Sequence, residues 1–382
     1  MAESIPSRKN SESSSTSSAQ ELTTWLASLF RENGGAISFE RFMAEALYHR
    51  EFGYYTHHIR TVGGSRGDFA TSPTLSTLLG KAIARWIRCE SESLDLKSLV
   101  HIIEIGGGEG SLMRDVIGGL DEGRRWFSRS AHRFHLVEIS PRLRERQRET
   151  LHRVRRRVTW HETIETALEA SGGTALIYSN ELVDAFPVAL LRYDGEGNWS
   201  EVCVAFEPGS GLREIFRPVT ETRPSLDRDA FAVLRKEDWS VIGQRVELHA
   251  SYRDWLHRWM PRWERGAMLT IDYGSPCPEE IYQRRPEGTL RAFFRHQRLT
   301  GAGIYRLFGK QDLTADVCFA DLARWGEALG AKTICQQSQS DFLCEFAGAA
   351  CGDAAQTDRS AAFLFEPDGA GEAFRVLSQR KG

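Results

Sequence analysis

Three glycines at alternate positions directly follow an apolar run. The run LVHIIEIG spans residues 99–106, and the segment EIGGGEG, which starts at Glu104, places glycines at Gly106, Gly108 and Gly110. Glycine has no Cβ atom, so the backbone can turn sharply and a ligand can lie against the main chain. A helix that follows such a turn presents free N–H groups to that ligand. The segment predicts a ligand-binding turn, although an ordinary turn between a strand and a helix would also contain glycines.

An acidic residue ends the next apolar run. The segment HLVE places Glu138 at the end of a second predicted strand, where a carboxylate can accept both hydrogen bonds of a vicinal ribose diol. A solvated glutamate at a strand end is the alternative. The fingerprint of dinucleotide-binding folds needs its third glycine at the position of Ser111, so the spacing disfavours NAD as the ligand.

Polar side chains also follow the buried run TALIYSNEL at residues 174–182. Asn180, Glu181 and Asp184 are expected at the carboxyl edge of the sheet, where open α/β folds bind ligands. Two carboxylates at this edge can hold a cationic nucleophile such as a guanidinium by bidentate hydrogen bonds. Acids in the first turn of a helix, where the helix dipole favours them, are the alternative. We favour the chemical role for Glu181 and weigh both interpretations equally for Asp184.

The segments that must position these residues alternate between strand and helix patterns. Apolar, β-branched runs are followed by amphipathic segments, as a parallel sheet with right-handed crossovers requires. We therefore predict an α/β fold with a mostly parallel central sheet flanked by helices. The predicted strands cover residues 99–106, 133–140, 157–161 and 174–182, and the predicted helices cover residues 110–120 and 141–151.

Other segments are expected to surround this core. The serine-rich N-terminus lacks apolar periodicity and predicts disorder. After Asp184 the pattern becomes antiparallel, which predicts an inserted subdomain that roofs the cleft together with N-terminal helices, and an amphipathic helix from Val246 to Trp259. The predicted division is a disordered tail at 1–20, N-terminal helices and an RGDF loop at 21–98, a core at 99–350 with an insertion at about 185–265, and a C-terminal extension at 351–382.

The composition excludes several classes of protein. Of the 382 residues, 41% are hydrophobic and 26% are charged, which rules out a collagen-like, wholly disordered or disulfide-scaffold protein. The 49 Lys and Arg residues against 52 Asp and Glu residues give a formal net charge of −3, so no global positive field favours nucleic acid. The arginines between residues 142 and 157 would scatter over several faces of a helix and pair with Glu145 and Glu149, which indicates a solvated surface. We expect no nucleic-acid partner.

The cysteines are typical of a reducing compartment. There are seven, an odd number, and none forms a C-x-x-C pair, so neither a disulfide framework nor a zinc site is predicted. No apolar run approaches the ~20 residues that a membrane helix needs. We therefore expect a cytoplasmic protein without membrane insertion and without a metal. A mitochondrial presequence would also be rich in serine and basic residues, but Glu3 and Glu12 disfavour it.

Several separated motifs together resemble the MidA-type methyltransferases, a family that includes a mitochondrial assembly factor of respiratory complex I. The pattern E-x-G-x-G-x-G is similar to the first motif of class I methyltransferases that use S-adenosyl-L-methionine (AdoMet). The resemblance covers roughly residues 21–350. Its motifs are FGYY (52–55), RGDFATSP (66–73), EIGGGEGSLM (104–113), HLVEISPRLRERQRETL (135–151), NELVDAFPV (180–188), IDYG (271–274), GTLRAF (288–293) and DLTADVCF (312–319).

The resemblance implies a class I methyltransferase fold and AdoMet-dependent N-methylation of an arginine in a protein substrate. It implies that the glycine loop, Glu138 and the RGDF loop hold the cofactor, and the two carboxylates at the strand edge, Glu181 and Asp184, are the residues that we expect to act on the methyl acceptor. A homodimer is a further expectation. The expected cofactor-binding residues are Gly67, Asp68, Ser72, Glu104, Gly106, Gly108, Gly110, Glu138 and Asn180.

Three positions depart from the usual motifs of this family. Thr74 replaces a glutamate, Asp316 replaces a histidine and Cys318 replaces an aspartate. These departures leave a rival hypothesis open, in which a non-catalytic assembly module keeps the cofactor fold and works by binding a partner. A NAD-linked oxidoreductase is the third hypothesis. We favour the enzyme because the glycines and Glu138 are intact.

Overall fold

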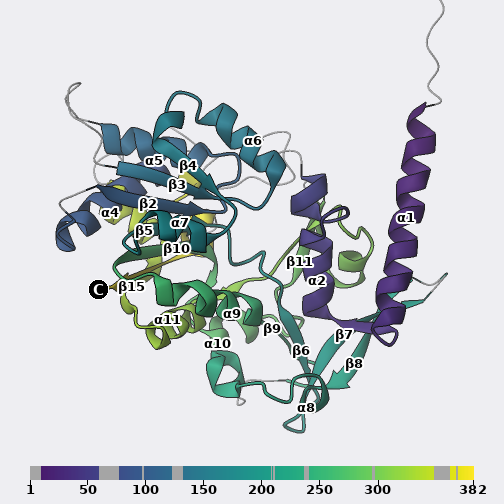
Figure 1. Cartoon of the computed structure of the whole chain (residues 1–382). Coiled ribbons are helices and arrows are strands. Elements are labelled where there is room, and N and C mark those ends of the chain that lie inside the picture. The colour runs from purple at the N-terminus through teal and green to yellow at the C-terminus, as the bar shows by residue number, and fades with distance from the viewer. Residues whose placement is uncertain are drawn as a thin grey trace, which may run out of the picture.

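The computed structural model describes two lobes that lie side by side (Figure 1). The larger lobe is built on a central sheet, and the smaller lobe joins the N-terminal helices to antiparallel strands. The described residues are 10–59, 77–96, 99–122, 132–207, 209, 211–235, 241–294, 297–347, 362–366 and 369–382.

In the described part of the chain, an eight-stranded sheet forms the centre of the larger lobe, in the order β15-β16-β10-β5-β2-β3-β4 with β14 paired to β10. The neighbours from β10 to β4 are parallel, whereas β16 is antiparallel to both β10 and β15. The predicted fold class is therefore confirmed. The strands are β2 (Val100–Ile105), β3 (His132–Val137), β4 (Val158–His161), β5 (Leu176–Asn180), β10 (Gly266–Ser275), β14 (Val317–Cys318), β15 (Lys332–Ser338) and β16 (Phe374–Lys381).

Helices cover both faces of this sheet, because each presents an apolar stripe at helical spacing. Helices α4, α5 and α12 share a buried cluster on one face, and α7, α9 and α11 share another on the opposite face (Figure 1). The larger helices are α4 (Leu78–Ser93), α5 (Ser111–Asp121), α6 (Pro141–Thr150), α7 (Ile164–Ala170), α9 (Ala250–Trp259), α11 (Phe319–Ala328) and α12 (Gln339–Ala347). Short helices are η2 (Arg155–Arg157), η3 (Arg228–Ala230), η4 (Ala232–Arg235), η5 (Met260–Arg262), α10 (Pro278–Tyr282) and α15 (Ala370–Ala373).

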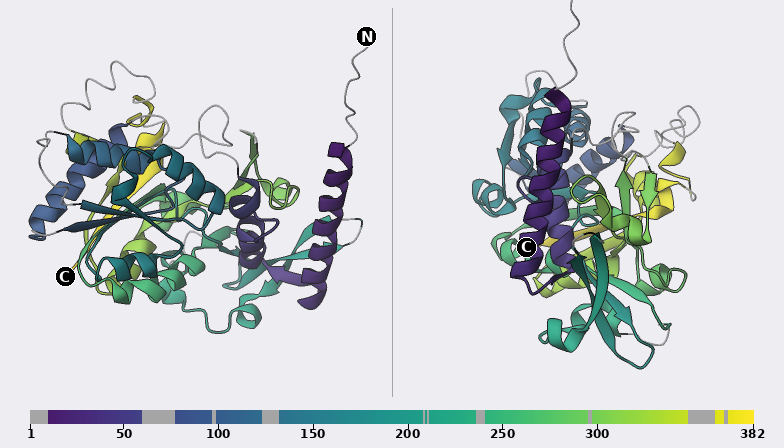
Figure 2. Two further views of the ribbon diagram at one scale, coloured as in Figure 1. Left: turned by 45° about the horizontal axis from the view of Figure 1, so that its top comes forward. Right: turned by 90° about the vertical axis from the view of Figure 1, so that its right-hand side faces the viewer.

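The smaller lobe packs antiparallel strands against the N-terminal helices. Strand β7 pairs with β1, β6 and β8, and β6 pairs with β9. Helix α1 lies on the outer side of this lobe (Figure 2). Its elements are α1 (Asn10–Glu32), β1 (Ala36–Ser38), α2 (Phe39–Tyr48), η1 (Tyr54–His58), β6 (Ala189–Tyr193), β7 (Trp199–Glu207), β8 (Gly211–Pro218), α8 (Val219–Thr222), β9 (Arg245–Leu248), β11 (Arg291–Phe294), β12 (Gln297–Leu299), η6 (Gly301–Tyr305) and β13 (Asp312–Thr314).

Helix α1 starts earlier than the sequence suggests. It begins at Asn10, within the segment for which disorder is predicted, while residues 1–9 lie outside the described residues. Leu26, Leu29 and Phe30 anchor the helix in the core of the smaller lobe. Because nucleation is the costly step of helix formation, turns added to an anchored helix need little further stabilisation.

Two other segments differ from their predicted roles. Val246 and Leu248 lie in β9, which pairs with β6, and the helix expected from Val246 begins only at Ala250. Strand β16 lies between β10 and β15, so the segment expected to be a C-terminal extension supplies a strand of the central sheet. The second half of β16 is the polar run SQRK, so a search for apolar runs does not predict a buried strand here.

Candidate functional site

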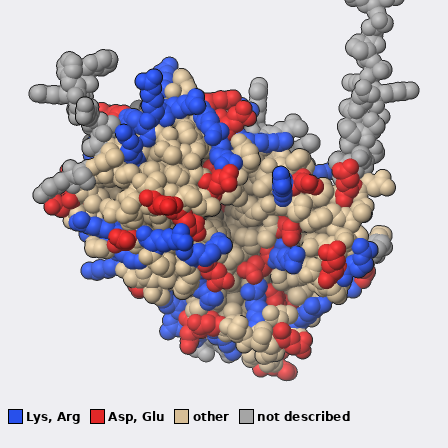
Figure 3. All heavy atoms as spheres, in the orientation of Figure 1, with Lys and Arg blue, Asp and Glu red and all other residues tan. Residues whose placement is uncertain are grey.

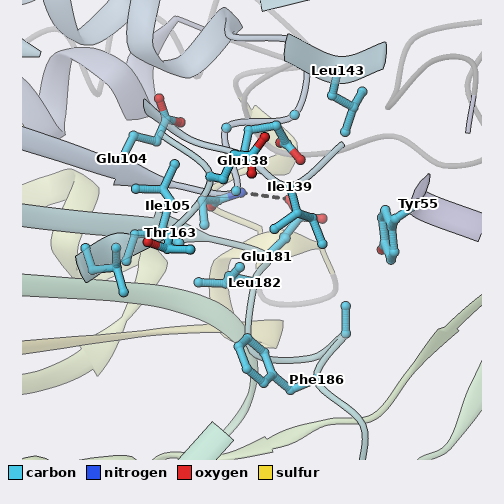
Figure 4. Close-up of a pocket in the computed structure, with 18 of the residues that line it drawn as sticks. Tyr55, Glu104, Ile105, Glu138, Ile139, Leu143, Thr163, Glu181, Leu182 and Phe186 are labelled. Carbon is cyan, nitrogen blue, oxygen red and sulfur yellow. Dashed lines mark hydrogen bonds between the residues drawn. The ribbon is translucent and has the colours of Figure 1, made fainter. Parts of the chain in front are cut away.

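A cavity of about 540 Å³ opens at the carboxyl ends of β2, β3 and β5, where open α/β sheets bind ligands. Its volume is in the range of small-molecule sites. The surface is hollowed between the two lobes (Figure 3). Glu138 and Glu181 point into the cavity, with Tyr55 on the far side and Phe186 below (Figure 4). The predicted site residues that line it are Glu104, Gly106, Gly108, Glu138, Asn180 and Glu181.

The predicted residues of the RGDF loop cannot be placed. Gly67, Asp68 and Ser72, together with the variant position Thr74, lie outside the described residues. Their assignment to the cofactor therefore stays a prediction.

The glycine loop has the backbone conformation that its sequence predicts. Gly106, Gly108 and Gly110 have φ angles of 71°, 51° and 82°, a left-handed region that side chains with a Cβ atom disfavour. Gly106 and Gly108 line the cavity. A Cβ atom on Gly110, however, would lie 3.4 Å from Gln147 of α6. Gly110 is thus placed for packing between α5 and α6, away from the cavity wall where we expected it.

Glu138 follows β3 and is only 6% exposed, although it lines the cavity. Its Oε1 accepts a hydrogen bond from the backbone N–H of Ser140 (2.9 Å), and its Oε2 accepts one from Nε2 of Gln147 (3.2 Å). Burial raises the pKa of Glu138 to about 7, and these two hydrogen bonds oppose the rise. The carboxylate is therefore held in one orientation at the cavity wall.

Glu104 is the second-last residue of β2, next to the glycine loop. It is buried, and its Oε2 accepts a hydrogen bond from the hydroxyl of Tyr178 at 3.2 Å. Burial raises the pKa of Glu104 to about 8. At neutral pH the side chain is therefore mostly a neutral carboxylic acid, which can donate a hydrogen bond as well as accept one.

Asn180 and Glu181 lie at the end of β5. Glu181 has a φ of 52°, which is uncommon for a residue other than glycine and is frequent at functional sites. Nδ2 of Asn180 donates a hydrogen bond to Oε1 of Glu181 at 3.0 Å. Among the described residues, none donates to the buried Oδ1 of Asn180. An unsatisfied acceptor next to a cavity is suited to a ligand that carries a donor.

Asp184 does not share this position. It is 5% exposed and is absent from the described residues that line the cavity. Burial raises its pKa, while the guanidinium of Arg291 opposes that rise. No helix begins at residues 181–188, so the alternative interpretation as helix-capping acids is wrong. The turn after β5 points Glu181 and Asp184 in different directions, and only the first reaches the cavity wall.

The opposite wall of the cavity could not be assigned from the sequence. Tyr48 and Tyr55 stack with their ring centroids 5.6 Å apart, and the ring of Phe186 lies 5.3 Å from that of Trp255. Arg258, one turn of α9 further on, is exposed at the same cavity. Tyr55 and Phe186 belong to the FGYY and NELVDAFPV motifs, so the sequence carried a signal for both. Tyr48, Trp255 and Arg258 come from the helices α2 and α9, whose apolar spacing indicates only packing.

Two of the three departures from the family motifs lie in the described part of the chain. Asp316 forms ion pairs with Arg285 and Arg291, so its charge is compensated within the protein. Cys318 is buried immediately before α11. Neither residue lines the cavity among the described residues. In the described ranges, no three His, Cys, Asp or Glu side chains are grouped to hold a metal ion.

Comparisons with known proteins agree with this geometry. The profile of a family of S-adenosyl-L-methionine-dependent methyltransferases matches residues 82–336. The mitochondrial protein arginine methyltransferase NDUFAF7 of Danio rerio is 29% identical over 322 residues, which cover 79% of this chain and 70% of the relative. Its Drosophila melanogaster homologue is 28% identical over 325 residues, which cover 79% of this chain and 69% of the relative.

A solved structure extends the likeness to the whole chain. The crystal structure of a Burkholderia thailandensis protein bound to S-adenosyl-homocysteine matches with a TM-score of 0.79 at 26% identity, covering 100% of this chain and 95% of that one. S-adenosyl-homocysteine is what AdoMet becomes after it has lost its methyl group. The likeness therefore favours AdoMet over NAD.

The relatives correct the expected location. The NDUFAF7 proteins of Danio rerio, Drosophila melanogaster and Homo sapiens are mitochondrial, which contradicts the prediction of a cytoplasmic protein. Unpaired cysteines indicate a reducing compartment and cannot by themselves say which one. None of the described helices has the length and apolarity needed to cross a bilayer. The matched profile spans most of the central sheet and the cavity, and the chain therefore belongs to the MidA-type family of AdoMet-dependent methyltransferases.

Proposed function

We propose that this protein transfers a methyl group from AdoMet to a nitrogen of an arginine side chain in a protein substrate. As a member of its family it is an AdoMet-dependent methyltransferase, and relatives are named protein arginine methyltransferases. The observation that carries the proposal is the placement of Glu181. Its carboxylate lines the same cavity as the glycine loop and Glu138.

Four features of the cavity fit AdoMet. The left-handed glycines leave a surface without side chains at Gly106 and Gly108, where the amino-acid end of AdoMet can lie. The unsatisfied Oδ1 of Asn180 can accept from its α-amino group. Glu138 can accept from the ribose hydroxyls, and Ile139, which is 50% exposed at the cavity, offers an apolar face to the adenine.

The side chains on the opposite wall suit a cationic acceptor. A guanidinium stays charged in proteins, and a carboxylate can hold two of its nitrogens by bidentate hydrogen bonds. Glu181 is the carboxylate that we assign to this contact, because Asp184 is buried away from the wall. The rings of Tyr48 and Tyr55 offer faces on which a guanidinium can stack. When AdoMet is bound it supplies an electrophilic methyl group on its sulfonium sulfur.

Glu181 would act in two ways on that acceptor. Holding two nitrogens fixes the third in the direction of attack, which converts an encounter into an oriented reaction. The carboxylate also draws the positive charge toward itself, so the attacking nitrogen is a better nucleophile. After transfer, the extra proton on the methylated nitrogen can pass to the carboxylate or to water.

The substrate is tested by labelling. Full-length protein would be incubated with AdoMet labelled in its methyl group and with the total protein of the source cell, and the labelled positions would be read by mass spectrometry. We expect label on arginine nitrogens. Label on lysine, nucleic acid or small molecules would overturn the arginine assignment, and an absence of label from an enzyme that binds AdoMet would overturn the proposed reaction as a whole. A homodimer and the lack of a nucleic-acid partner stay predictions.

Replacing Glu138 with alanine should weaken AdoMet binding by about 1.5–3 kcal/mol, the range for hydrogen bonds to a charged group. Calorimetric titration measures the change directly. Glu162→Ala is a matched control, because Glu162 also lines the cavity but is exposed and should contribute less. An unchanged AdoMet affinity in Glu138→Ala, combined with slower methyl transfer, would show that Glu138 contacts the methyl acceptor and not the cofactor.

The raised pKa of Glu138 predicts opposite pH dependences for binding and stability. Burial raises its pKa to about 7, so the ionised form that accepts from a ribose diol increases between pH 6 and 8, and AdoMet affinity should rise over that range. The native state holds this proton more tightly than the unfolded chain, whose glutamate pKa is about 4.3. The contribution of Glu138 to folding stability should therefore fall as pH rises from about 4.3 to about 7 and level off above that pH. Calorimetry and denaturant titrations at pH 5, 6, 7 and 8 measure both. Glu138→Gln should flatten the rise in affinity and reduce the fall in stability, to which Glu104 also contributes.

A further inference from the structure

Asp272 of the IDYG motif holds the turn that follows β5. It lies on β10, the neighbour of β5 in the sheet, and it is fully buried. Its Oδ2 accepts three hydrogen bonds from successive backbone N–H groups, those of Leu182 (3.0 Å), Val183 (2.7 Å) and Asp184 (3.3 Å). Its Oδ1 accepts from the N–H of Tyr273 at 2.8 Å. No helix or strand satisfies these three N–H groups, so the carboxylate replaces secondary structure at this turn.

The turn determines where Glu181 points. The N–H of Glu181 donates to the carbonyl of Ile271 at 3.0 Å, which continues the pairing between β5 and β10 by one residue. Glu181 then adopts its left-handed φ of 52°, a conformation that costs roughly 1–2 kcal/mol for a residue with a Cβ atom. Three successive N–H groups that donate to one carboxyl oxygen compensate such a cost. Two neighbouring residues of β10 therefore hold the backbone around Glu181. Ile271 accepts from its own N–H, and Asp272 accepts from the N–H groups of the three residues that follow it.

We infer that Asp272 is a positioning residue for methyl transfer, which acts by clamping the three N–H groups after Glu181 and so directs the Glu181 side chain into the cavity. Asp272 itself does not line the cavity among the described residues, so it reaches the acceptor only through Glu181. The inference rests on the proposed role of Glu181 and adds to it the device that fixes its geometry.

The strength of the clamp can be varied by substitution. In Asp272→Ala the three N–H groups lose their acceptor and the turn is free to relax. In Asp272→Asn the amide oxygen can still accept the hydrogen bonds of the turn. The amide nitrogen then faces the N–H of Tyr273, and two donors cannot form a hydrogen bond, so only part of the clamp remains. Thr270→Val is a matched control, because Thr270 is a buried polar residue of the same strand whose hydroxyl forms a hydrogen bond with Tyr252 and not with the turn after β5.

The test measures the initial rate of methyl transfer from labelled AdoMet into total protein of the source cell, together with the AdoMet dissociation constant. We expect Asp272→Ala to lower the rate at saturating AdoMet by about 10²-fold, the scale of a misplacement of about 1 Å. Asp272→Asn should lose about tenfold, because part of the clamp remains. AdoMet affinity should change little in both variants, and Thr270→Val should resemble the unaltered protein.

A double substitution separates positioning from a general structural role. If Asp272 acts through Glu181, then Asp272→Asn combined with Glu181→Gln should be no slower than Glu181→Gln alone, because residues of one unit are non-additive. Additive losses, or a parallel loss of AdoMet affinity and thermal stability, would overturn the positioning role and leave the proposed function intact. A Glu181→Gln enzyme with an undiminished rate would instead overturn the proposed role of Glu181.

Discussion

Glu181→Gln should lower the rate of methyl transfer by about 10²-fold or more, while AdoMet still binds with nearly unchanged affinity. The glutamine side chain has the same shape, so the turn after β5 and its hydrogen bonds to Asp272 stay in place. It is neutral, however, and an NH2 group replaces one of the two carboxylate oxygens. This group donates hydrogen bonds and cannot accept one from a guanidinium. The loss should therefore appear in turnover, measured with labelled AdoMet, and not in calorimetric titration of the cofactor.

Glu165→Gln is the matched control for this substitution. Glu165 is also a carboxylate at the cavity, but it comes from α7, on the side of Glu138 and Ile139. Loss of its charge should leave turnover at saturating AdoMet unchanged. Equal losses in Glu165→Gln and Glu181→Gln would show that the cavity needs negative charge in general, which would contradict a specific contact between Glu181 and the acceptor. Asp184→Asn should lose less than Glu181→Gln, because Asp184 is buried behind the wall.

The residues on the cofactor side of the cavity could be predicted from the sequence because local sequence patterns determine the strands and turns that carry them. The run before Gly106 and the run that ends in Glu138 predict strands by themselves, and the alternation of strands and helices makes them parallel neighbours. Parallel neighbours end at one edge of a sheet, so the glycine loop, Glu138 and Glu181 had to come together. The structure places them around one cavity.

The acceptor side was not readable because it depends on tertiary contacts. Tyr48 lies on α2 and Trp255 on α9, and in a sequence both look like members of an apolar helix stripe. Only the tertiary packing brings both side chains to the same cavity. Gly110 shows the converse, since its spacing suggested cofactor contact, but it lies against Gln147 and its φ of 82° is what requires glycine.

The proposed role of Asp272 could not be predicted from the sequence either. A motif such as IDYG marks Asp272 in the sequence, but an aspartate at a strand end has many possible uses. Its three hydrogen bonds go to residues about 90 positions earlier in the chain, and no spacing rule connects two segments so far apart. The parallel pairing of β5 with β10 is what brings them together.

Gly108→Val should weaken AdoMet binding by about 10²-fold or more, because the new side chain occupies the surface on which the cofactor lies. Gly108 has a φ of 51°, a conformation in which valine is strained, so folding stability should also fall by roughly 1–2 kcal/mol. At Gly106 the same substitution would also bring a Cβ atom within 2.9 Å of the side chain of Leu182. Calorimetry measures the affinity, and a denaturant titration measures the stability.

Gly118→Val provides the same substitution at a position that should not matter. Gly118 lies in α5, the helix that follows the glycine loop, and a Cβ atom there would meet no neighbour within 4 Å. Because valine has a higher helix propensity than glycine, this variant should keep its stability and its AdoMet affinity. A folded Gly108→Val protein that binds AdoMet as well as Gly118→Val does would contradict the assignment of the glycine loop to the cofactor, since the loop would then tolerate a side chain where the cofactor is proposed to lie.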